Sequence, residues 1–430
     1  MQALRVVADL HIHSRFSRAT SQNMDITEIT RYANIKGLKL VGTGDFTHPK
    51  WFGELSDDLI EVEDSSLYGS RNHPDSPVRY MLTAEVCTTY YVNGKNKRIH
   101  HVIFTPSLET ASQISDRLKK YGDLTVDGRP FLEMTSAQLV EEVMEVSEMN
   151  EVVPAHVWTP WFSLFGAFSG FDTIEDCYED MTKHIHALET GLSSDPPMNW
   201  RLSSLDRFTL ISNSDCHSHW PWRIGREANV FEFDKLTYGE VVDTIRKKDS
   251  KRFKFTIETN PAYGKYHWSG HRKCNISLPP EDSMKYGNSC PKCGRKLTRG
   301  VDQRIEELAD RPADYVPEDV IGYKHLLPLH EIIKAVIRVS SVATKKVWSI
   351  YNPLIKRFGD EYTVLMDAPQ EEMEKVVDAK VGDAVVRVRE EKARVIPGYD
   401  GVYGELVLFE EEQEVMEPQK PKQKSMSDFI

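Results

Sequence analysis

The chain contains 430 residues with a net charge of −12, and 40% of its residues are hydrophobic. This length predicts two or three domains, and the hydrophobic fraction is sufficient for globular cores. The negative net charge excludes a protein that binds nucleic acid through its overall charge, so any contact with DNA requires local basic patches. No apolar run is long enough to span a membrane and no signal peptide precedes the first strand, so we expect no membrane association. The six cysteines are unevenly placed and do not form a disulfide framework, which predicts a reducing, cytoplasmic setting.

The first expected strand, Leu4–Leu10, ends in two histidines one residue apart, His11 and His13. Side chains at positions i and i+2 of an extended segment point to the same side, so both imidazoles can bind one metal ion. Alone, the motif fits two polar loop residues better than a ligand pair. A metal site therefore requires further ligands from elsewhere in the chain.

Residues 1–235 alternate apolar strands with helical patterns, which predicts an α/β fold. Helices are expected at Ile26–Ile35, Ala111–Lys120 and Ala137–Ser147, the last with a capping box at Thr135 and Gln138. Apolar strands alternating with helices favour a parallel sheet or barrel covered on both faces, one unit short of the eight-stranded type. The expected strands are Leu4–Leu10, Leu38–Thr43, Arg79–Val86, Ile99–Thr105, Glu151–His156, His184–Glu189 and Phe208–Ser214.

A histidine or carboxylate lies in or just after every one of these strands. Because parallel barrels build their sites from several strand ends on one face, seven successive strands of this kind predict a metal centre. Two or three divalent ions, Zn²⁺, Mn²⁺ or Mg²⁺, would fit such ligands, with Glu85 able to bridge two of them. The candidate ligands are His11, His13, Asp45, His48, Glu85, His101, His156, Asp215 and His217, of which Asp215, Glu85 and His13 are the candidate catalytic residues.

A second metal motif lies at residues 271–293. His271 and Cys274 are followed after fifteen residues by Cys290 and Cys293, a spacing typical of structural zinc. His267 is an alternative fourth ligand. We therefore expect a small zinc-binding module within residues 236–302.

Two further groups of residues are candidates for DNA contact. Basic residues around the zinc motif predict a phosphate-binding surface, although a solvated charged face is the alternative. Aromatic residues on the loops after His156 and His217 could stack an unpaired base, although packing at the barrel rim is the alternative for each one. These candidates are Arg272, Lys273, Arg295 and Lys296, and Trp158, Trp161, Phe162, Trp220 and Trp222.

The remainder of the chain predicts an α+β C-terminal domain at residues 303–409. Residues 303–365 have helical patterns, and residues 378–410 have the alternation of short strands. Residues 410–430 are charged and rich in Pro, Lys and Gln, which predicts a disordered tail. The last eight residues resemble the box that binds the sliding clamp PCNA, through Gln423, Met426, Phe429 and Ile430.

The motifs DLHIHS, GTGDFTH, PAH and NSDCH resemble, in order, those of the polymerase-and-histidinol-phosphatase (PHP) superfamily. That resemblance implies a distorted (β/α)7 barrel, a trinuclear metal site and phosphoester hydrolysis. It implies one ion on His11, His13, Glu85 and Asp215, a second on Glu85, His101 and His156, and a third that His48 and His217 help to hold. The family's further histidine is absent near Ala19, and its compact Asp-His is spread here from Asp45 to His48, so the third ion is open and Asp45 could replace a ligand.

The combination of a PHP barrel, a zinc module, a basic C-terminal domain and a clamp-binding tail resembles the archaeal endonuclease Q family. This implies a DNA repair endonuclease that uses metal-activated water to cut 5′ of uracil, hypoxanthine, xanthine or an abasic site. The expected setting is the nucleoid of a prokaryotic cell. The alternatives are a small-molecule phosphatase of the PHP type, a DNA exonuclease and a non-catalytic clamp-associated scaffold.

Overall fold

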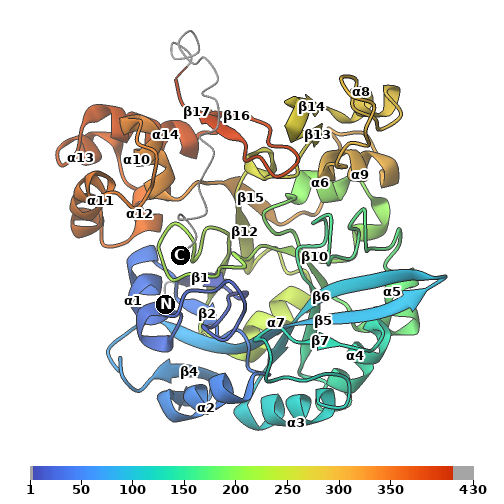
Figure 1. The fold of residues 1–430 in the computed structure, drawn as a ribbon. Coiled ribbons are helices and arrows are strands. Elements are labelled where there is room, and N and C mark those ends of the chain that lie inside the picture. The colour runs from blue at the N-terminus through green and yellow to red at the C-terminus, as the bar shows by residue number, and fades with distance from the viewer. Residues whose placement is uncertain (1–2, 410–430) are drawn as a thin grey trace, which may run out of the picture.

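The computed structural model describes residues 3–409 of the chain (Figure 1). A mixed β-sheet closes most of a barrel, and two smaller regions lie at one end of it. The helices α10–α14, between residues 329 and 389, form one of these regions, and the segment around β13 and β14, at residues 269–278, forms the other. The proposed clamp-binding residues Gln423, Met426, Phe429 and Ile430 lie outside the described residues.

The barrel sheet starts from β1, which pairs in parallel with β2 and antiparallel with β11. The α/β class predicted from the sequence is confirmed, and the sheet continues past residue 235 because β12 and β15 extend it beyond β11. The short pair β9 and β10 runs parallel beside it. The strands are β1 (Leu4–Asp9), β2 (Leu40–Gly42), β3 (Leu59–Val62), β4 (Leu67–Ser70), β5 (Arg79–Val92), β6 (Lys95–Thr105), β7 (Phe131–Leu132), β8 (Glu151–Pro154), β9 (Ala187–Glu189), β10 (Thr209–Ile211), β11 (Ala228–Phe233), β12 (Phe253–Glu258) and β15 (Gly322–His325).

The expectation of parallel strands throughout is wrong at β5, β6 and β8. β5 pairs antiparallel with β6, and β6 pairs antiparallel with β8. The cause is a tight hairpin, because Asn93 and Gly94 both have positive φ angles, 49° and 74°. An Asn-Gly dipeptide between two apolar runs is a hairpin signal, and it joins two strands that the alternating pattern had separated.

Helices cover the outer face of the barrel sheet. The capping box predicted at Thr135 and Gln138 is confirmed at the start of α4, where each side chain bonds the other residue's backbone N–H. Asp25 caps α1 through the backbone N–H of Glu28. These helices are α1 (Ile26–Lys36), α2 (Pro49–Asp58), α3 (Leu108–Leu118), α4 (Ser136–Met144), α5 (Glu175–Tyr178) and α7 (Tyr238–Arg246), whereas α6 (Pro196–Trp200) packs against α9 (Val301–Leu308).

The C-terminal region is helical for longer than the sequence pattern indicates. Residues 379–389 were expected to be strand but form helix α14, which buries Val381, Val385 and Val388 on one stripe. These valines recur every three to four residues, and packing on a helical neighbour outweighs their β propensity. The helices are α10 (Leu329–Ile337), α11 (Lys345–Phe358), α12 (Glu361–Met366), α13 (Gln370–Glu374) and α14 (Ala379–Arg389), followed by the hairpin β16 (Arg394–Ile396) and β17 (Glu405–Val407).

The remaining elements surround the cysteine motif. The hairpin of β13 (Ser269–His271) and β14 (Ile276–Leu278) packs beside α8 (Pro280–Lys285) and α9 (Val301–Leu308). In Figure 1 this region and the helices α10–α14 lie apart from each other above the same end of the barrel. No helix within residues 3–409 has the length and apolar character needed to cross a bilayer.

Candidate metal centre

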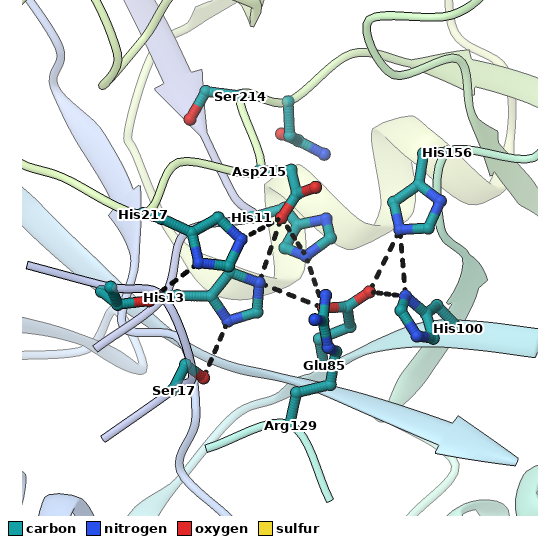
Figure 2. Close-up of polar contacts among 12 residues, drawn as sticks. His11, His13, Ser17, Glu85, His100, Arg129, His156, Ser214, Asp215 and His217 are labelled. Carbon is teal, nitrogen blue, oxygen red and sulfur yellow. Dashed lines mark hydrogen bonds and ion pairs between the residues drawn. The ribbon is translucent and has the colours of Figure 1, made fainter. Parts of the chain in front are cut away.

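Two groups of ligand atoms meet at Glu85, on strand β5 (Figure 2). His11, His13 and Asp215 gather around its Oε2, with His13 Nε2 at 3.1 Å from that oxygen and at 3.0 Å from Asp215 Oδ1. His100 and His156 face its Oε1 at 2.7 and 3.2 Å. One carboxylate thus joins both groups, as the sequence predicted for Glu85.

Buried carboxylates orient the two histidines of the His-x-His motif. Glu189 accepts from His11 Nδ1 at 3.0 Å, and Asp45 accepts from His13 Nδ1 at 3.0 Å, which turns each Nε2 toward Glu85. His11 Nε2 is buried and makes no hydrogen bond to protein. An imidazole held by a carboxylate with its other nitrogen free is the usual arrangement of a metal ligand. Both groups therefore fit divalent ions.

The structure places His100, rather than His101, at the centre. On the hairpin, Cys87 pairs with His100 and Val86 pairs with His101, so His100 shares the face of Glu85 and His101 does not. His101 instead bonds the hydroxyls of Thr88 and Tyr178 at 3.0 and 2.9 Å. The assignment of His101 to the second ion is therefore corrected to His100.

The expected ligands of a third ion do not come together. Both oxygens of Asp45 are occupied by His13, Ser14 and Ser17. His48 stacks on Phe16 and bonds the carbonyl oxygen of Thr125 at 3.2 Å. Within residues 3–409, neither residue belongs to a group of three ligand atoms, so their assignment as ligands is corrected. Around Glu85, residues 3–409 form only the two groups of ligand atoms described above, and a third ion at this centre stays a prediction.

His217 lies beside the first ligand group without completing another. Its ring stacks on His13 with centroids 4.5 Å apart, and its Nε2 is 3.6 Å from Asp215 Oδ1. Its Nδ1 is 2.8 Å from Thr20 Oγ1. His217 therefore lines the cavity next to Asp215.

Three residues of the centre have left-handed backbone conformations that side chains rarely adopt. The φ angles of Asp45, His156 and Asp215 are 51°, 32° and 45°. Such strain persists where the surrounding structure fixes the chain, and it gathers at functional sites. Gly191 permits one of these positions, because a Cβ on it would lie 2.6 Å from the Cβ of His156.

Charge in the cluster holds the carboxylates ionised. Burial alone would raise the pKa of Glu85, but the hydrogen bond from His100 and the charge of the Arg129 guanidinium hold it well below its usual range. Burial likewise opposes ionisation of Asp215, but hydrogen bonds from His13 and His217 hold its pKa well below normal. Burial lowers the pKa of His100 to about 4, so its ring is neutral, the form that binds metal.

Arg129 is a member of the site that sequence reasoning missed. Its guanidinium donates to Glu85 Oε2 at 3.1 Å and lines the cavity above the ligands. It follows the loop that packs Gly128 against Asp45, where a Cβ would lie 2.3 Å from Asp45 Oδ2. No motif marks this arginine, because only the folded loop brings it to Glu85.

A cavity of about 800 Å³ opens above the ligands. Trp161 and Phe162 line it, as expected, together with Tyr266 and Tyr403. Trp161 is 40% exposed, and its ring stacks on Phe168 with centroids 4.9 Å apart.

Three of the aromatic candidates do not reach this cavity. Trp158 is 1% exposed and donates to Asn199. Trp220 and Trp222 stack on each other at 5.2 Å and pack against Trp348 of the C-terminal helices. For these three, the alternative of packing at the barrel rim is correct. Trp222 borders a second cavity, of about 270 Å³.

The zinc motif is assembled as the spacing predicts. Ligand atoms of His271, Cys274, Cys290 and Cys293 lie within 4.8 Å of one another, and His267 is not among them. Burial raises the pKa of Cys290, but the Lys292 backbone and His271 outweigh it and hold that pKa at about 6. Four such ligands fit tetrahedral zinc with no open position, which is a structural site.

The basic candidates of this region lie on its surface. Arg272, Lys273, Arg295 and Lys296 are exposed, and none of them lines the cavity above the metal centre. They surround the cysteine cluster as the sequence predicted, but the contact with DNA stays a prediction.

Fold and site together define a class of protein. An α/β barrel with a carboxylate shared by two groups of imidazole and carboxylate ligands is the arrangement of a metal-dependent phosphodiesterase. A crystal structure of the lesion-specific endonuclease Q from Pyrococcus furiosus is 33% identical, with a TM-score of 0.84, over 96% of this chain and 98% of that chain. The chain belongs to the endonuclease Q family.

The chain is also similar to a second endonuclease Q structure and to the protein MJ0043. A complex of endonuclease Q with a 27-mer duplex that has an abasic lesion at the active site matches with a TM-score of 0.83, 33% identity and the same coverage. An uncharacterized protein of Methanocaldococcus jannaschii, MJ0043, is 36% identical over 253 residues, which is 58% of this chain but only 31% of that relative. The family model of the MJ0043 C-terminal domain matches residues 328–392, the region of α10 to α14.

Proposed function

We propose that the chain nicks DNA on the 5′ side of a deaminated base (uracil, hypoxanthine or xanthine) or an abasic site. The observation that carries this proposal is the pair of ligand groups sharing Glu85 at the floor of an open cavity. Membership of the endonuclease Q family supports it, and a relative was crystallised with an abasic duplex at its active site. Two divalent ions held there would lower the pKa of water and stabilise the attacking and leaving oxygens.

The chain's own residues would position the scissile phosphate over Glu85. Arg129, Arg223 and Arg226 line the cavity and offer guanidinium groups to the non-bridging oxygens. His11 and His13, fixed through Nδ1 by Glu189 and Asp45, present Nε2 without rotating. Because these groups are already oriented, little reorganisation is needed when the substrate binds.

The lesion nucleotide would leave the base stack and enter the aromatic part of the site. Trp161 and Phe162 wall the 800 Å³ cavity, and the 270 Å³ cavity bordered by Trp222, Tyr263 and Tyr403 adjoins it. Both cavities share Tyr403 and Arg226. A mispaired or missing base costs less to unstack than a normal pair, which favours damaged sites.

The domain roles follow as proposals. The barrel at residues 1–235 would hydrolyse the phosphodiester bond. The zinc module within residues 236–302 and the C-terminal domain at residues 303–409 would bind the duplex. One zinc ion would stabilise the fold of the module. The DNA phosphates would be contacted by Arg272, Lys273, Arg295 and Lys296. We place this activity at the chromosomal DNA, in the nucleoid of a prokaryotic cell.

The test is a nicking assay on an end-labelled duplex that carries one deoxyuridine, deoxyinosine, deoxyxanthosine or abasic site. The expected product is one internal nick on the 5′ side of the lesion, with the undamaged duplex intact. Degradation from an end would indicate an exonuclease, and phosphate release from small monoesters without nicking would indicate a phosphatase. Asp215→Asn should abolish nicking while retaining DNA binding, and full activity of this variant with metal present would contradict the assignment.

We further propose that the C-terminal residues Gln423, Met426, Phe429 and Ile430 bind the sliding clamp PCNA. Their spacing supports this, since Met426 and Phe429 are three positions apart in the sequence and would share one side of a helical turn formed on binding. Calorimetric titration of PCNA with the full chain should give binding that Phe429→Ala removes. Equal binding by both proteins would contradict this proposal.

A further inference from the structure

The loop that carries Asp215 is held on one side by the barrel. It spans residues 212–227, between β10 and β11. Asp9, at the end of β1, accepts from the backbone N–H of Ser214 at 3.0 Å and from that of Gly225 at 2.8 Å. The Arg226 guanidinium also donates to the carbonyl oxygen of Ser214, at 3.0 and 2.8 Å. Both ends of the loop are therefore fastened next to the metal ligand.

The C-terminal helices fasten the same loop from the opposite side. The hydroxyl of Tyr362, on α12, donates to the carbonyl oxygen of Gly225. Tyr362 is 3% exposed, so water does not compete for this hydrogen bond. The approach is close, because a Cβ on Gly225 would lie 2.8 Å from the tyrosine oxygen. Gly225 thus bonds Asp9 through its N–H and Tyr362 through its carbonyl.

A buried ion pair makes a second connection between the same parts. Lys36, on α1, donates to Glu361 at 2.7 Å and to the carbonyl oxygen of Pro221 in the loop at 2.9 Å. Glu361 also accepts from the Leu329 N–H at 3.0 Å and from the Tyr351 hydroxyl at 2.8 Å. Lys36 and Glu361 are 1% and 0% exposed at their side chains. Helices α10, α11 and α12 therefore converge on one carboxylate that reaches the loop through Lys36.

The metal ligand needs such support. Asp215 has a φ of 45°, a conformation that a free loop would leave. We infer that Tyr362 is a positioning residue for Asp215, and that the docked C-terminal helices hold the metal centre in its binding geometry. The chain of contacts runs from Tyr362 through Gly225 and Asp9 to Ser214, the residue before Asp215. The C-terminal region then acts on catalysis as well as on substrate binding.

The test is Tyr362→Phe in the full chain, which removes one hydroxyl and keeps the ring. Two readouts are compared with the unmodified protein: Mn²⁺ affinity by calorimetric titration without DNA, and kcat and KM for nicking a lesion duplex. We expect Mn²⁺ affinity and kcat to fall about tenfold each, as for other residues that support a ligand, with KM unchanged. The activity readout rests on the proposed function, but the Mn²⁺ readout does not, so their failures are distinguishable.

Tyr238→Phe is the matched control. Tyr238 is also buried, and its hydroxyl donates to the carbonyl oxygen of Met149 at 2.7 Å, away from the 212–227 loop. This variant should keep Mn²⁺ affinity and kcat. The inference is overturned if Tyr362→Phe matches it in both readouts.

A second variant keeps the inference testable if Tyr362→Phe does not fold. Circular dichroism of each variant at the assay temperature establishes that the protein is folded. Should Tyr362→Phe be unfolded there, Tyr351→Phe tests the connection through Glu361 and Lys36. A lower Mn²⁺ affinity of that variant supports the inference, and an unchanged affinity overturns it.

Discussion

The zinc cluster and the barrel centre, both within residues 3–409, differ in how they are built. The zinc cluster draws its ligands from residues 271–293, with Cys293 exposed at the surface. The barrel centre draws on residues from His11 to Asp215 and is almost entirely buried. Three thiolates and one imidazole without an open position stabilise a fold, whereas a carboxylate shared beneath an 800 Å³ cavity leaves room for a substrate. A structural metal site differs from a catalytic one in the types of its ligands and in whether a substrate can reach the metal, and not in whether ligands are present.

The largest effect expected from this comparison follows Glu85→Gln. Losing the charge that both ligand groups share should lower kcat for nicking about a thousandfold, equivalent to ~4 kcal/mol of transition-state stabilisation. The measurement is kcat on a lesion duplex, with metal content by mass spectrometry. Glu151→Gln is the control, since Glu151 is equally buried but pairs with His186 and Arg246 outside the centre. A kcat that fell equally in both variants would contradict the role of Glu85.

The register of the β5–β6 hairpin is tested by two neighbouring histidines. His100→Ala should lower kcat about a hundredfold, because it removes a ligand that faces Glu85. His101→Ala should keep kcat but lower the melting temperature, because it removes the buried hydrogen bonds that His101 makes with the hydroxyls of Tyr178 and Thr88. Steady-state kinetics and thermal unfolding separate the two. The reverse order of kcat values would show that the metal-facing histidine is His101.

The barrel centre should bind metal more tightly as pH rises. Burial lowers the pKa of His13, but Asp45 outweighs it and raises that pKa well above the ordinary value, so the metal-free ring holds a proton at neutral pH. Metal requires the neutral ring, and affinity should rise about tenfold per pH unit for each proton released. In the metal-free protein the protonated ring stabilises the fold below its ordinary pKa, and this contribution is lost as pH rises through the raised pKa.

Mn²⁺ titrations between pH 6 and 8, in buffers of different ionisation enthalpy, measure the affinity and the released protons. An affinity that stays constant over this range would show that His13 is neutral before metal binds.

The smallest effect is expected at the zinc cluster. Cys290→Ser should remove one equivalent of zinc and raise KM for duplex DNA about fivefold, because the basic residues around it lose their support. The kcat should remain, since no ligand of the barrel centre is touched. Cys177→Ser is the control, because Cys177 is a free, buried cysteine outside both clusters. A lower kcat in Cys290→Ser alone would show that the zinc cluster takes part in catalysis.

Sequence alone determined the features whose residues lie close together along the chain. The knuckles around Cys274 and Cys290, the capping box at Thr135 and the His-x-His motif each depend on spacings of a few residues. Such spacings fix geometry before any tertiary contact forms. The alternation of strands and helices likewise gave the α/β class, and the ordered motifs gave the family.

Only the tertiary structure decided which side chains meet. Pairing across the β5–β6 hairpin chose His100 over His101, and loop packing brought Arg129 to Glu85. Asp45 became a support for His13 because a buried carboxylate with four hydrogen-bonding groups around it has no free oxygen. The tie from Tyr362 to the loop of Asp215 joins residues far apart in the chain. These outcomes depend on register and burial, which a single sequence does not specify.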